Sequence, residues 1–338
     1  MTETARFGPA VWDAHGHYLP ESVVPLLSSG HLSVVAQEGE GGHGLVINGV
    51  LAGTTTESLS EAELILDSMD RAGLDRRVLS PPPFAFRYGE DATETRDVAR
   101  RINEATAEIV RAHPERFAGL CTLPLQDPPL AVEEMGKALG DLGLAGVSVG
   151  TNIGGRLLSD PSLRPFFHEV EERGVPVLVH PEFVPSARYA DYYLINVIGM
   201  PVETGTTIAN IILSGLLEEH PGLRLCFVHG GGIAPYLLGR WSHTWRVRDD
   251  ISRDTTLPPE KQLGNLFWDS LTHSPEALGF LVRLMGAGNV VVGTDAPFDV
   301  ADPTPLETLA AAPWLSEADR LEIACRAPLR WLQGGDRF

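Results

Sequence analysis

Lysine is scarce in this sequence, and positive charge is scarce with it. Lys137 and Lys261 are its only lysines, and its 26 basic residues face 45 acidic ones, which gives a formal net charge of −19 at pH 7. A surface this acidic is a poor match for the phosphate backbone of a nucleic acid or for an anionic membrane. We therefore expect neither nucleic acid nor membrane as a partner, although a few local cations can still bind a small anion.

Cysteine and long apolar runs are scarce as well. Cys121, Cys226 and Cys325 are far apart and form no CxxC pair, so they predict neither a disulfide framework nor a metal knuckle. No apolar run reaches the roughly 18 residues that a bilayer span requires. The first residues lack the basic and then apolar order of a signal peptide. We expect a cytoplasmic protein with reduced, buried thiols.

The chain has ample material for a core, with 338 residues of which 43% are hydrophobic. Short apolar runs alternate with amphipathic stretches, and eight of these runs lie near residues 12, 78, 120, 148, 178, 226, 268 and 292. Runs that are almost wholly apolar are typical of parallel strands covered on both faces. Eight strand–helix units predict a (β/α)8 TIM barrel, with a doubly wound open sheet as the alternative. No GxGxxG motif follows the first strand, which disfavours the open sheet.

We expect one domain over residues 1–338. Residues 28–58 interrupt the alternation, because they are rich in Gly, Ser and Thr with short β-prone pieces, and they predict an inserted β hairpin or flap after the first strand. A helix over residues 60–73 is expected to begin with Ser60 as its cap and Glu63 as its capping-box partner. A single helix is expected over residues 203–220.

The residues that can carry chemistry share one place in the predicted barrel. His15 and His17 follow the first strand, His180 ends the fifth, His229 ends the sixth and Asp295 ends the eighth. The carboxyl ends of barrel strands meet at one mouth, where the active sites of TIM barrels lie. The topology therefore predicts that four imidazoles and one carboxylate lie together.

These side chains suit a divalent metal ion. Residues i and i+2 of an extended segment point the same way, so His15 and His17 can face one ion. Imidazole and carboxylate are ligands of Zn²⁺ and its neighbours, and such an ion lowers the pKa of a bound water toward about 7. A lone HxH or one histidine at a strand end is more often structural, so the prediction depends on the joint placement.

Several stretches resemble the amidohydrolase superfamily, and most closely the group typified by aminocarboxymuconate semialdehyde and resorcylate-type decarboxylases. The resemblance covers nearly the whole chain. It is carried by residues 13–20 (DAHGHYLP), 177–181 (VLVHP), 199–204 (GMPVET), 212–215 (ILSG), 226–232 (CFVHGGG), 237–240 (LLGR), 245–246 (WR) and 293–298 (GTDAPF).

The resemblance implies a zinc ion held by His15, His17, His180 and Asp295, with Mn²⁺ as the other candidate. It implies that His229 and Asp295 are the catalytic pair, with His229 as acid and base beside the metal rather than as a ligand. It also implies non-oxidative decarboxylation, in which a proton reaches the carbon that loses CO₂. A conjugated or aromatic carboxylic acid can hold the charge that develops, so we expect a substrate of that class.

The chain departs from this pattern where the semialdehyde decarboxylases use an arginine from the early insertion to bind a carboxylate. Residues 7–70 contain neither Arg nor Lys, so we expect a less anionic or more apolar substrate. Arg87, after the second strand, and Asn196, on the long loop after the fifth, are candidate substrate-binding residues. Arg240 matches the family's second arginine, which crosses a dimer interface, so we also expect a homodimer.

Three functions remain open from the sequence. The first is a metal-dependent decarboxylase, a carbon–carbon lyase. The second is a metal-dependent hydrolase or hydratase that acts on a lactone, amide, C–C bond or double bond, because the same ligands serve these reactions. The third is a silent metal-binding protein, which is disfavoured because His15, His17, His180, His229 and Asp295 are all present. The substrate-binding groups decide between the first two.

Overall fold

Eight parallel strands form the centre of the protein. The structure is a computed structural model that describes residues 10–28, 32–36, 42–47, 50–184 and 186–334. In sheet order the strands are β1 (Trp12–His17), β5 (Arg76–Ser80), β6 (Phe117–Cys121), β7 (Gly146–Gly150), β10 (Pro176–His180), β11 (Arg224–Phe227), β12 (Leu266–Asp269) and β13 (Val290–Val291). Each strand lies beside its neighbour in sequence among these eight, as the predicted alternation requires.

The sheet closes on itself between its first and last strands. The amide of Ala14 donates to the carbonyl of Val292 at 2.7 Å, and Gly16 forms a parallel bridge with Ala296. The carbonyl of His15 accepts from the amides of Thr294 and Asp295. The predicted (β/α)8 barrel is therefore confirmed, and the doubly wound open sheet is wrong because its edge strands would stay apart.

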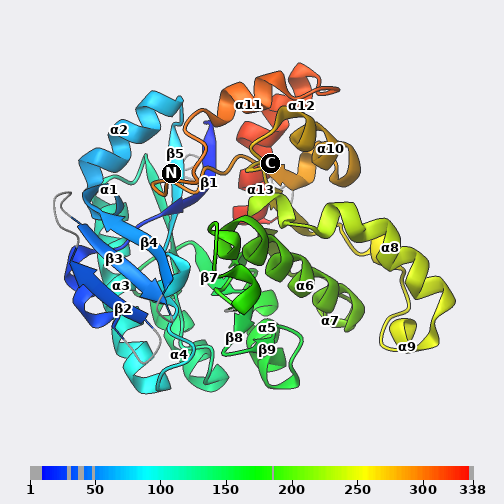
Figure 1. The fold of residues 1–338 in the computed structure, drawn as a ribbon, viewed down its shortest axis with the longest axis horizontal. Helices are drawn as coiled ribbons and strands as arrows, with labels where there is room; N and C mark the ends of the chain where they lie inside the picture. The colour runs from blue at the N-terminus through cyan, green and yellow to red at the C-terminus, as the bar shows by residue number, and fades with distance from the viewer. Residues whose placement is uncertain (1–9, 29–31, 37–41, 48–49, 185, 335–338) are drawn as a thin grey trace.

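Helices surround the barrel (Figure 1). The main ones are α2 (Ala62–Ala72), α3 (Ala92–Ala112), α4 (Pro128–Gly140), α5 (Arg164–Glu172), α6 (Met200–Leu213), α8 (Ala234–Val247), α10 (Pro275–Met285), α11 (Pro305–Ala311), α12 (Glu317–Leu321) and α13 (Ala327–Gln333). Shorter helices are α1 (Glu57–Ser60), α7 (Leu216–Glu219) and α9 (Asp249–Ser252). In the part of the chain that the structure describes, no helix combines the length and the apolar character needed to cross a membrane.

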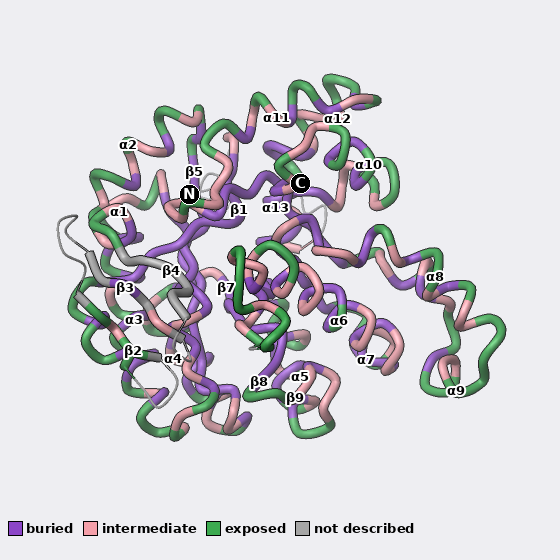
Figure 2. The backbone as a smooth tube through the Cα atoms, in the orientation of Figure 1, coloured by how far each residue is buried: buried purple, intermediate pink, exposed green. Residues whose placement is uncertain are grey.

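Packed side chains fill the barrel interior, and helix α13 covers its amino-terminal end. Arg224, at the start of β11, donates from Nε to the carbonyl of Trp331 at 2.7 Å, which ties α13 to that end. Figure 2 shows the central strands almost wholly buried. The interior cluster consists of Trp12, Ala14, Val78, Ala118, Leu120, Leu178, Cys226, Val228, Phe267, Val291, Ala327, Leu329, Trp331 and Leu332. The cavities of the structure lie at the other end, at the carboxyl ends of the strands.

The expected insertion after the first strand is present as a small antiparallel sheet. It has three strands, β2 (Leu32–Ala36), β3 (Gly42–Ile47) and β4 (Val50–Thr56), in the order β2–β3–β4. Figure 1 shows this sheet on one flank of the barrel, apart from α8 and α9. Thr56, the last residue of β4, reaches the mouth of the barrel, where it lines a cavity.

A β-bulge in β1 redirects its side chains. Asp13 pairs with Arg77, but Gly16 pairs with Leu79, so β1 contains one residue more than β5 between the same two rungs. Such a bulge re-aims the side chains that follow it, and bulges are frequent next to active sites. Ala14 therefore packs inside the barrel, while the buried ring of His15 belongs to the mouth.

Two helix predictions are wrong in detail. Ser60 ends α1 rather than capping the next helix, and its Oγ donates to the carbonyl of Glu57; α2 then begins after Glu61 without a side-chain cap. The helix expected over residues 203–220 is two helices, because Gly215 has a φ of +77° and ends the first. A Cβ on Gly215 would lie 2.5 Å from the carbonyl oxygen of Asp254, so the loop after α9 occupies that space.

Two glycines near the start of α8 should respond differently to replacement by alanine, as measured by the free energy of unfolding. A Cβ on Gly231 would lie 2.4 Å from the Trp268 ring, and its φ is +76°. We expect Gly231→Ala to lower the free energy of unfolding by about 1–3 kcal/mol. Gly239, in α8, has open space around its Cβ position, so Gly239→Ala should be neutral or stabilise by up to about 1 kcal/mol. Urea unfolding of both variants checks this, and equal effects would contradict the crowding at Gly231.

Candidate functional site

Five side chains meet at the mouth of the barrel. His15 and His17 come from β1, His180 from the end of β10, and His229 and Asp295 from the turns after β11 and β13. Neighbouring imidazole rings lie 5.1–5.4 Å apart, centre to centre. The structure thus brings together all five residues that the sequence placed at strand ends.

The carboxylate of Asp295 lies at the centre of this group. Its Oδ1 is 2.9 Å from Nε2 of His17 and 3.3 Å from Nε2 of His15. Its Oδ2 is 3.3 Å from Nε2 of His229. The two oxygens therefore face different imidazoles, with the β1 histidines on one side and His229 on the other.

The other ring nitrogens are held by groups behind the mouth. Nδ1 of His15 lies 2.7 Å from Oδ2 of Asp269, and Nδ1 of His180 lies 3.0 Å from the carbonyl oxygen of Pro181. Nδ1 of His17 lies 3.3 Å from Oγ of Ser80. Each contact fixes the ring and leaves its Nε2 directed at the centre, which is how metal-binding histidines are oriented.

The donor atoms fit a metal ion. Nε2 of His15 and Nε2 of His180 are buried and, among the described residues, have no hydrogen-bond partner. One ligand atom from each of His15, His180, His229 and Asp295 lies within 4.8 Å of the others. This set contains His229 in place of His17, whereas the ligand set expected from the sequence has His17. Buried nitrogen atoms left without partners are costly unless a cation or a proton fills the space between them.

The charges of the site also favour a cation. Burial by itself would lower the pKa of His15, but the charge of nearby Asp295 and the hydrogen bond to Asp269 raise it to about 10. Burial would raise the pKa of Asp295, yet the neighbouring imidazoles hold it well below its usual range. Burial and the nearby imidazoles lower the pKa of His180 far below its ordinary value. The carboxylate of Asp295 and the imidazole of His180 are thus in the forms that bind a metal, whereas His15 would have to release its proton on binding.

Asp269 is a site residue that the sequence reasoning missed. It is fully buried at the end of β12, and its Oδ1 accepts hydrogen bonds from the amides of Gly230 and Leu271, at 2.7 and 3.1 Å. One carboxylate therefore orients His15 and fixes the turn that follows His229. The available signal was its position, because it ends the seventh strand as His180 ends the fifth.

A buried ion pair positions β1 below the mouth. Nε of Arg77 donates to Oδ2 of Asp13 at 2.7 Å, with the two side chains 3% and 0% exposed. Oγ1 of Thr294 donates to the same oxygen, also at 2.7 Å, and the amide of His15 donates to Oδ1. Asp13 thereby joins β1 to its neighbours on both sides. These contacts fix the position of His15 relative to Asp295.

The backbone is strained at two of the five residues. His229 has a φ of +56° and Asp295 has a φ of +61°, a region that costs a residue with a side chain on the order of 1–3 kcal/mol. Strain of this kind persists where the surrounding structure holds it, often at active sites. Here it turns both side chains toward the centre at points where the strands have ended.

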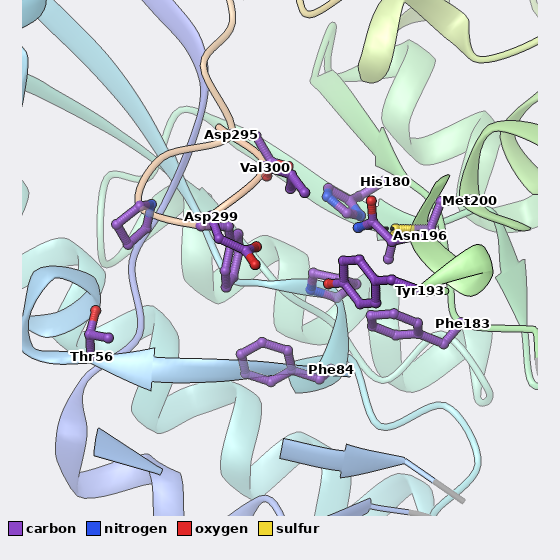
Figure 3. A pocket seen from close by; sticks show the side chains of 13 residues that line it. Thr56, Phe84, His180, Phe183, Tyr193, Asn196, Met200, Asp295, Asp299 and Val300 are labelled. Carbon is purple, nitrogen blue, oxygen red and sulfur yellow. Dashed lines mark hydrogen bonds between the residues drawn. The ribbon is translucent and has the colours of Figure 1, made fainter. Parts of the chain in front are cut away.

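Two cavities that share several lining residues open above these residues. The smaller, of about 270 Å³, is shown in Figure 3 and is lined by His180, aromatic rings and Asp295. The larger, of about 520 Å³, is lined by His229, Thr272 and His273 among mainly apolar residues. Asp295 and Asn196 line both cavities, so a ligand in either one meets the central carboxylate.

The three candidate substrate-binding residues lie in different places. Asn196 lines both cavities, on a π-helical turn, η6 (Ile195–Gly199), just before α6. Arg87 lines neither cavity, and its Nη1 donates to the carbonyls of Leu26 and Leu27. Arg240 is exposed on α8 and also lines neither cavity.

The structure adds Tyr193 and Phe84 to the residues that line the smaller cavity (Figure 3). Tyr193 lies on the long loop after β10, and Phe84 follows β5 directly after a run of three prolines. The sequence could not show that these two residues, rather than their neighbours, reach the cavity.

A family model described as amidohydrolase matches residues 12–333. The chain belongs to the amidohydrolase family. This confirms the resemblance drawn from the sequence motifs. Over 262 residues the protein is 36% identical to a 2-amino-3-carboxymuconate-6-semialdehyde decarboxylase of Dictyostelium discoideum, covering 77% of this chain and 73% of the relative. Over 284 residues it is 29% identical to a gamma-resorcylate decarboxylase of Rhizobium sp. (strain MTP-10005), covering 76% of this chain and 83% of the relative.

This amidohydrolase-family protein has the same fold as several solved structures of other proteins. The 5-carboxyvanillate decarboxylase of Sphingomonas paucimobilis superposes with a TM-score of 0.82 at 23% identity, covering 96% of this chain and 99% of that one. A dihydroxybenzoic acid decarboxylase of Polaromonas sp. JS666, solved with bound manganese and the inhibitor 2-nitroresorcinol, gives a TM-score of 0.77 at 20% identity and covers 96% of both chains. At these identities the likeness shows the barrel fold.

The role of Asp269 behind His15 leads to a prediction. We expect Asp269→Asn to fold but to bind Zn²⁺ about 10- to 100-fold more weakly, because the neutral amide holds the His15 imidazole less firmly. Competition with a chelating dye measures the affinity. Asp302→Asn is the control, because among the described residues the Asp302 side chain accepts hydrogen bonds from its own segment, at Thr304 and Thr308. Unchanged affinity in Asp269→Asn would show that its contact with His15 does not support metal binding.

Proposed function

We propose that this protein is a metal-dependent non-oxidative decarboxylase that acts on a conjugated or aromatic carboxylic acid. The observation that carries the proposal is that the two carboxylate oxygens of Asp295 face different imidazoles, Oδ1 facing His15 and His17 and Oδ2 facing His229. His229, which can hold a proton, thus lies next to the candidate metal ligands, at the floor of a cavity with aromatic walls. The decarboxylases among its amidohydrolase relatives support the same reaction, that of a carbon–carbon lyase.

The proposed ligands are His15, His17, His180 and Asp295. The partnerless Nε2 atoms of His15 and His180 and the contact between His17 and Asp295 support this set. A divalent ion bound there would act as a Lewis acid and lower the pKa of a water molecule. Zn²⁺ is the proposed ion and Mn²⁺ the alternative, because imidazole with carboxylate suits both.

His229 is the proposed acid and base, with Asp295 as its partner. Nε2 of His229 can hold a proton against Oδ2 of Asp295, and the imidazole also borders the larger cavity. In decarboxylation this proton goes to the carbon that bears the carboxylate. The C–C bond then breaks, CO₂ leaves, and the electron pair of that bond returns to the conjugated system. A histidine is well matched to such a transfer near neutral pH.

The cavity supports an aromatic substrate. Phe84, Phe183 and Phe298 line it and offer flat apolar surfaces to a ring, while Asn196 offers hydrogen bonds close to Asp295. We therefore propose Asn196 as a substrate-binding residue. Arg87 is engaged with the carbonyls of Leu26 and Leu27 and would have to leave them to serve the same role.

We further propose a homodimer formed through α8. This helix exposes Arg240, and its Tyr236 and Val247 side chains are 84% and 63% exposed. Exposed apolar side chains beside a cation suit a protein interface. A cytoplasmic location is part of the same proposal, because Cys121, Cys226 and Cys325 are buried free thiols that a reducing compartment preserves.

Turnover in D₂O tests the reaction class. We expect a phenolic or unsaturated acid to lose one CO₂ and to gain one deuterium at the carbon that carried the carboxylate, because that carbon receives a solvent-derived proton. Evolved CO₂ is measured together with the product's NMR spectrum. Acids that stay intact while esters, lactones or diketones are cleaved by the metal-loaded protein would replace the proposal with the hydrolase alternative.

The role of His229 predicts a separation between metal binding and turnover. His229→Ala should keep the metal but lose about 100-fold or more in kcat, since general acid–base groups contribute that much. His243→Ala, an exposed histidine of α8 that lines neither cavity, is the matched control. Elemental analysis and rates are measured on the same samples. Loss of the metal in His229→Ala would instead make His229 a ligand, and an unchanged rate would remove it from the mechanism.

A further inference from the structure

Asp299 faces the cavity but is not one of the five residues that meet at the barrel mouth. Asp299 lines the smaller cavity together with His180 and Asp295. It follows Phe298, whose amide donates to the carbonyl of Asp295 at 3.2 Å, so the short turn after Asp295 sets its place. Figure 3 shows Asp299 and Tyr193 both turned toward the cavity.

The charge of Asp299 is not balanced by cations in the cavity walls. No Lys or Arg lines either cavity in the part of the chain that the structure describes. The field of this carboxylate reaches across the cavity, because the pKa of Tyr193 is raised first by burial and then by the charges of Asp299 and Asp295. A second anion in this cavity would therefore meet the repulsion of Asp299, with no Lys or Arg in the described lining to offset it.

The opposite wall is a strained segment that presents a hydroxyl group. Tyr192 and Tyr193 both have a φ of +55°, and the π-helical turn η6 begins shortly after them. The Tyr192 side chain is 91% exposed, whereas Tyr193 lines the cavity. Such strain is retained where the surroundings impose it, so Tyr193 is held opposite Asp299 rather than placed there by a relaxed loop.

The cavity combines polar groups with apolar walls. His180 and Asp295 mark the metal end, and Asp299 and Tyr193 also face the cavity (Figure 3). Phe84, Phe183 and Phe298 supply apolar wall surface. An aromatic acid that places its carboxylate at the metal end lies in the same cavity as Asp299, which can accept a hydrogen bond from an O–H or N–H group on the ring.

We propose that Asp299 is a specificity-determining residue that selects aromatic acids with a single carboxylate and a further hydroxyl or amino group on the ring, and disfavours dicarboxylates. The inference rests on the proposed decarboxylase function and deepens it by naming the substrate class. It concerns the charge of one residue, so it can be tested without disturbing the metal ligands.

The test compares two acids that share a salicylate core. One is 4-aminosalicylate, and the other is 2-hydroxyterephthalate, which has a carboxylate in place of the amino group. Affinity is measured by calorimetry and CO₂ release by gas analysis, for the metal-loaded wild type, Asp299→Asn and Asp191→Asn. Asp191 is an exposed acid on the loop that carries Tyr193, and it lines neither cavity, so this control removes the same charge nearby.

We expect the wild type to bind 4-aminosalicylate more tightly than 2-hydroxyterephthalate. Asp299→Asn should reduce this ratio of affinities about tenfold or more, mainly because it binds 2-hydroxyterephthalate more tightly. Asp191→Asn should keep the wild-type preference. A preference that Asp299→Asn leaves unchanged, or that Asp191→Asn reduces equally, would overturn the proposal. If neither acid loses CO₂ but the affinities still follow this pattern, the selectivity role of Asp299 stands and the decarboxylase function fails.

Discussion

The structure depends on a buried negative charge at the barrel mouth. The carboxylate of Asp295 is 4% exposed and is surrounded by imidazoles, and a second carboxylate, Asp269, lies fully buried behind His15. Charges withdrawn from water in this way are unfavourable unless protons, hydrogen bonds or a cation compensate them. The raised pKa of His15 means that, without a metal, a proton on its imidazole balances part of this charge. A divalent cation that replaces this proton would satisfy the carboxylate of Asp295 and the ring nitrogens together, so a metal would stabilise the site as well as supply its chemistry.

Much of the barrel serves to hold that arrangement. The bulge in β1 lets Ala14 fill the interior while His15 belongs to the mouth. The ion pair of Asp13 and Arg77 then fixes β1 against β5, and Thr294 extends the contact to the segment that carries Asp295. Because α13 covers the amino-terminal end, we expect the substrate to approach at the carboxyl ends of the strands, where the cavities with aromatic walls lie above the imidazoles. Rigid strands thus set the distances, and the loops after them supply selectivity.

The sequence predicted the barrel and the grouping of the metal-site residues well, because both follow from local signals. Apolar runs mark buried parallel strands, and a polar residue that ends such a run must lie at the mouth. Contacts between distant segments left no such signal. Asp269 ends a strand in the same way, but its contact with His15 depends on the bulge in β1. The helix break at Gly215 depends on the Asp254 carbonyl, and the direction of the Arg87 side chain depends on the carbonyls of Leu26 and Leu27.

The most direct test of the account is a calorimetric titration of the chelator-stripped protein with Zn²⁺, in parallel with Asp295→Ala. The account predicts one site per chain in the wild type, release of protons as imidazoles give them up to the metal, and affinity reduced by orders of magnitude in the variant. If the wild type binds no ion, or binds it no more tightly than Asp295→Ala, then the five residues at the barrel mouth are not a metal centre.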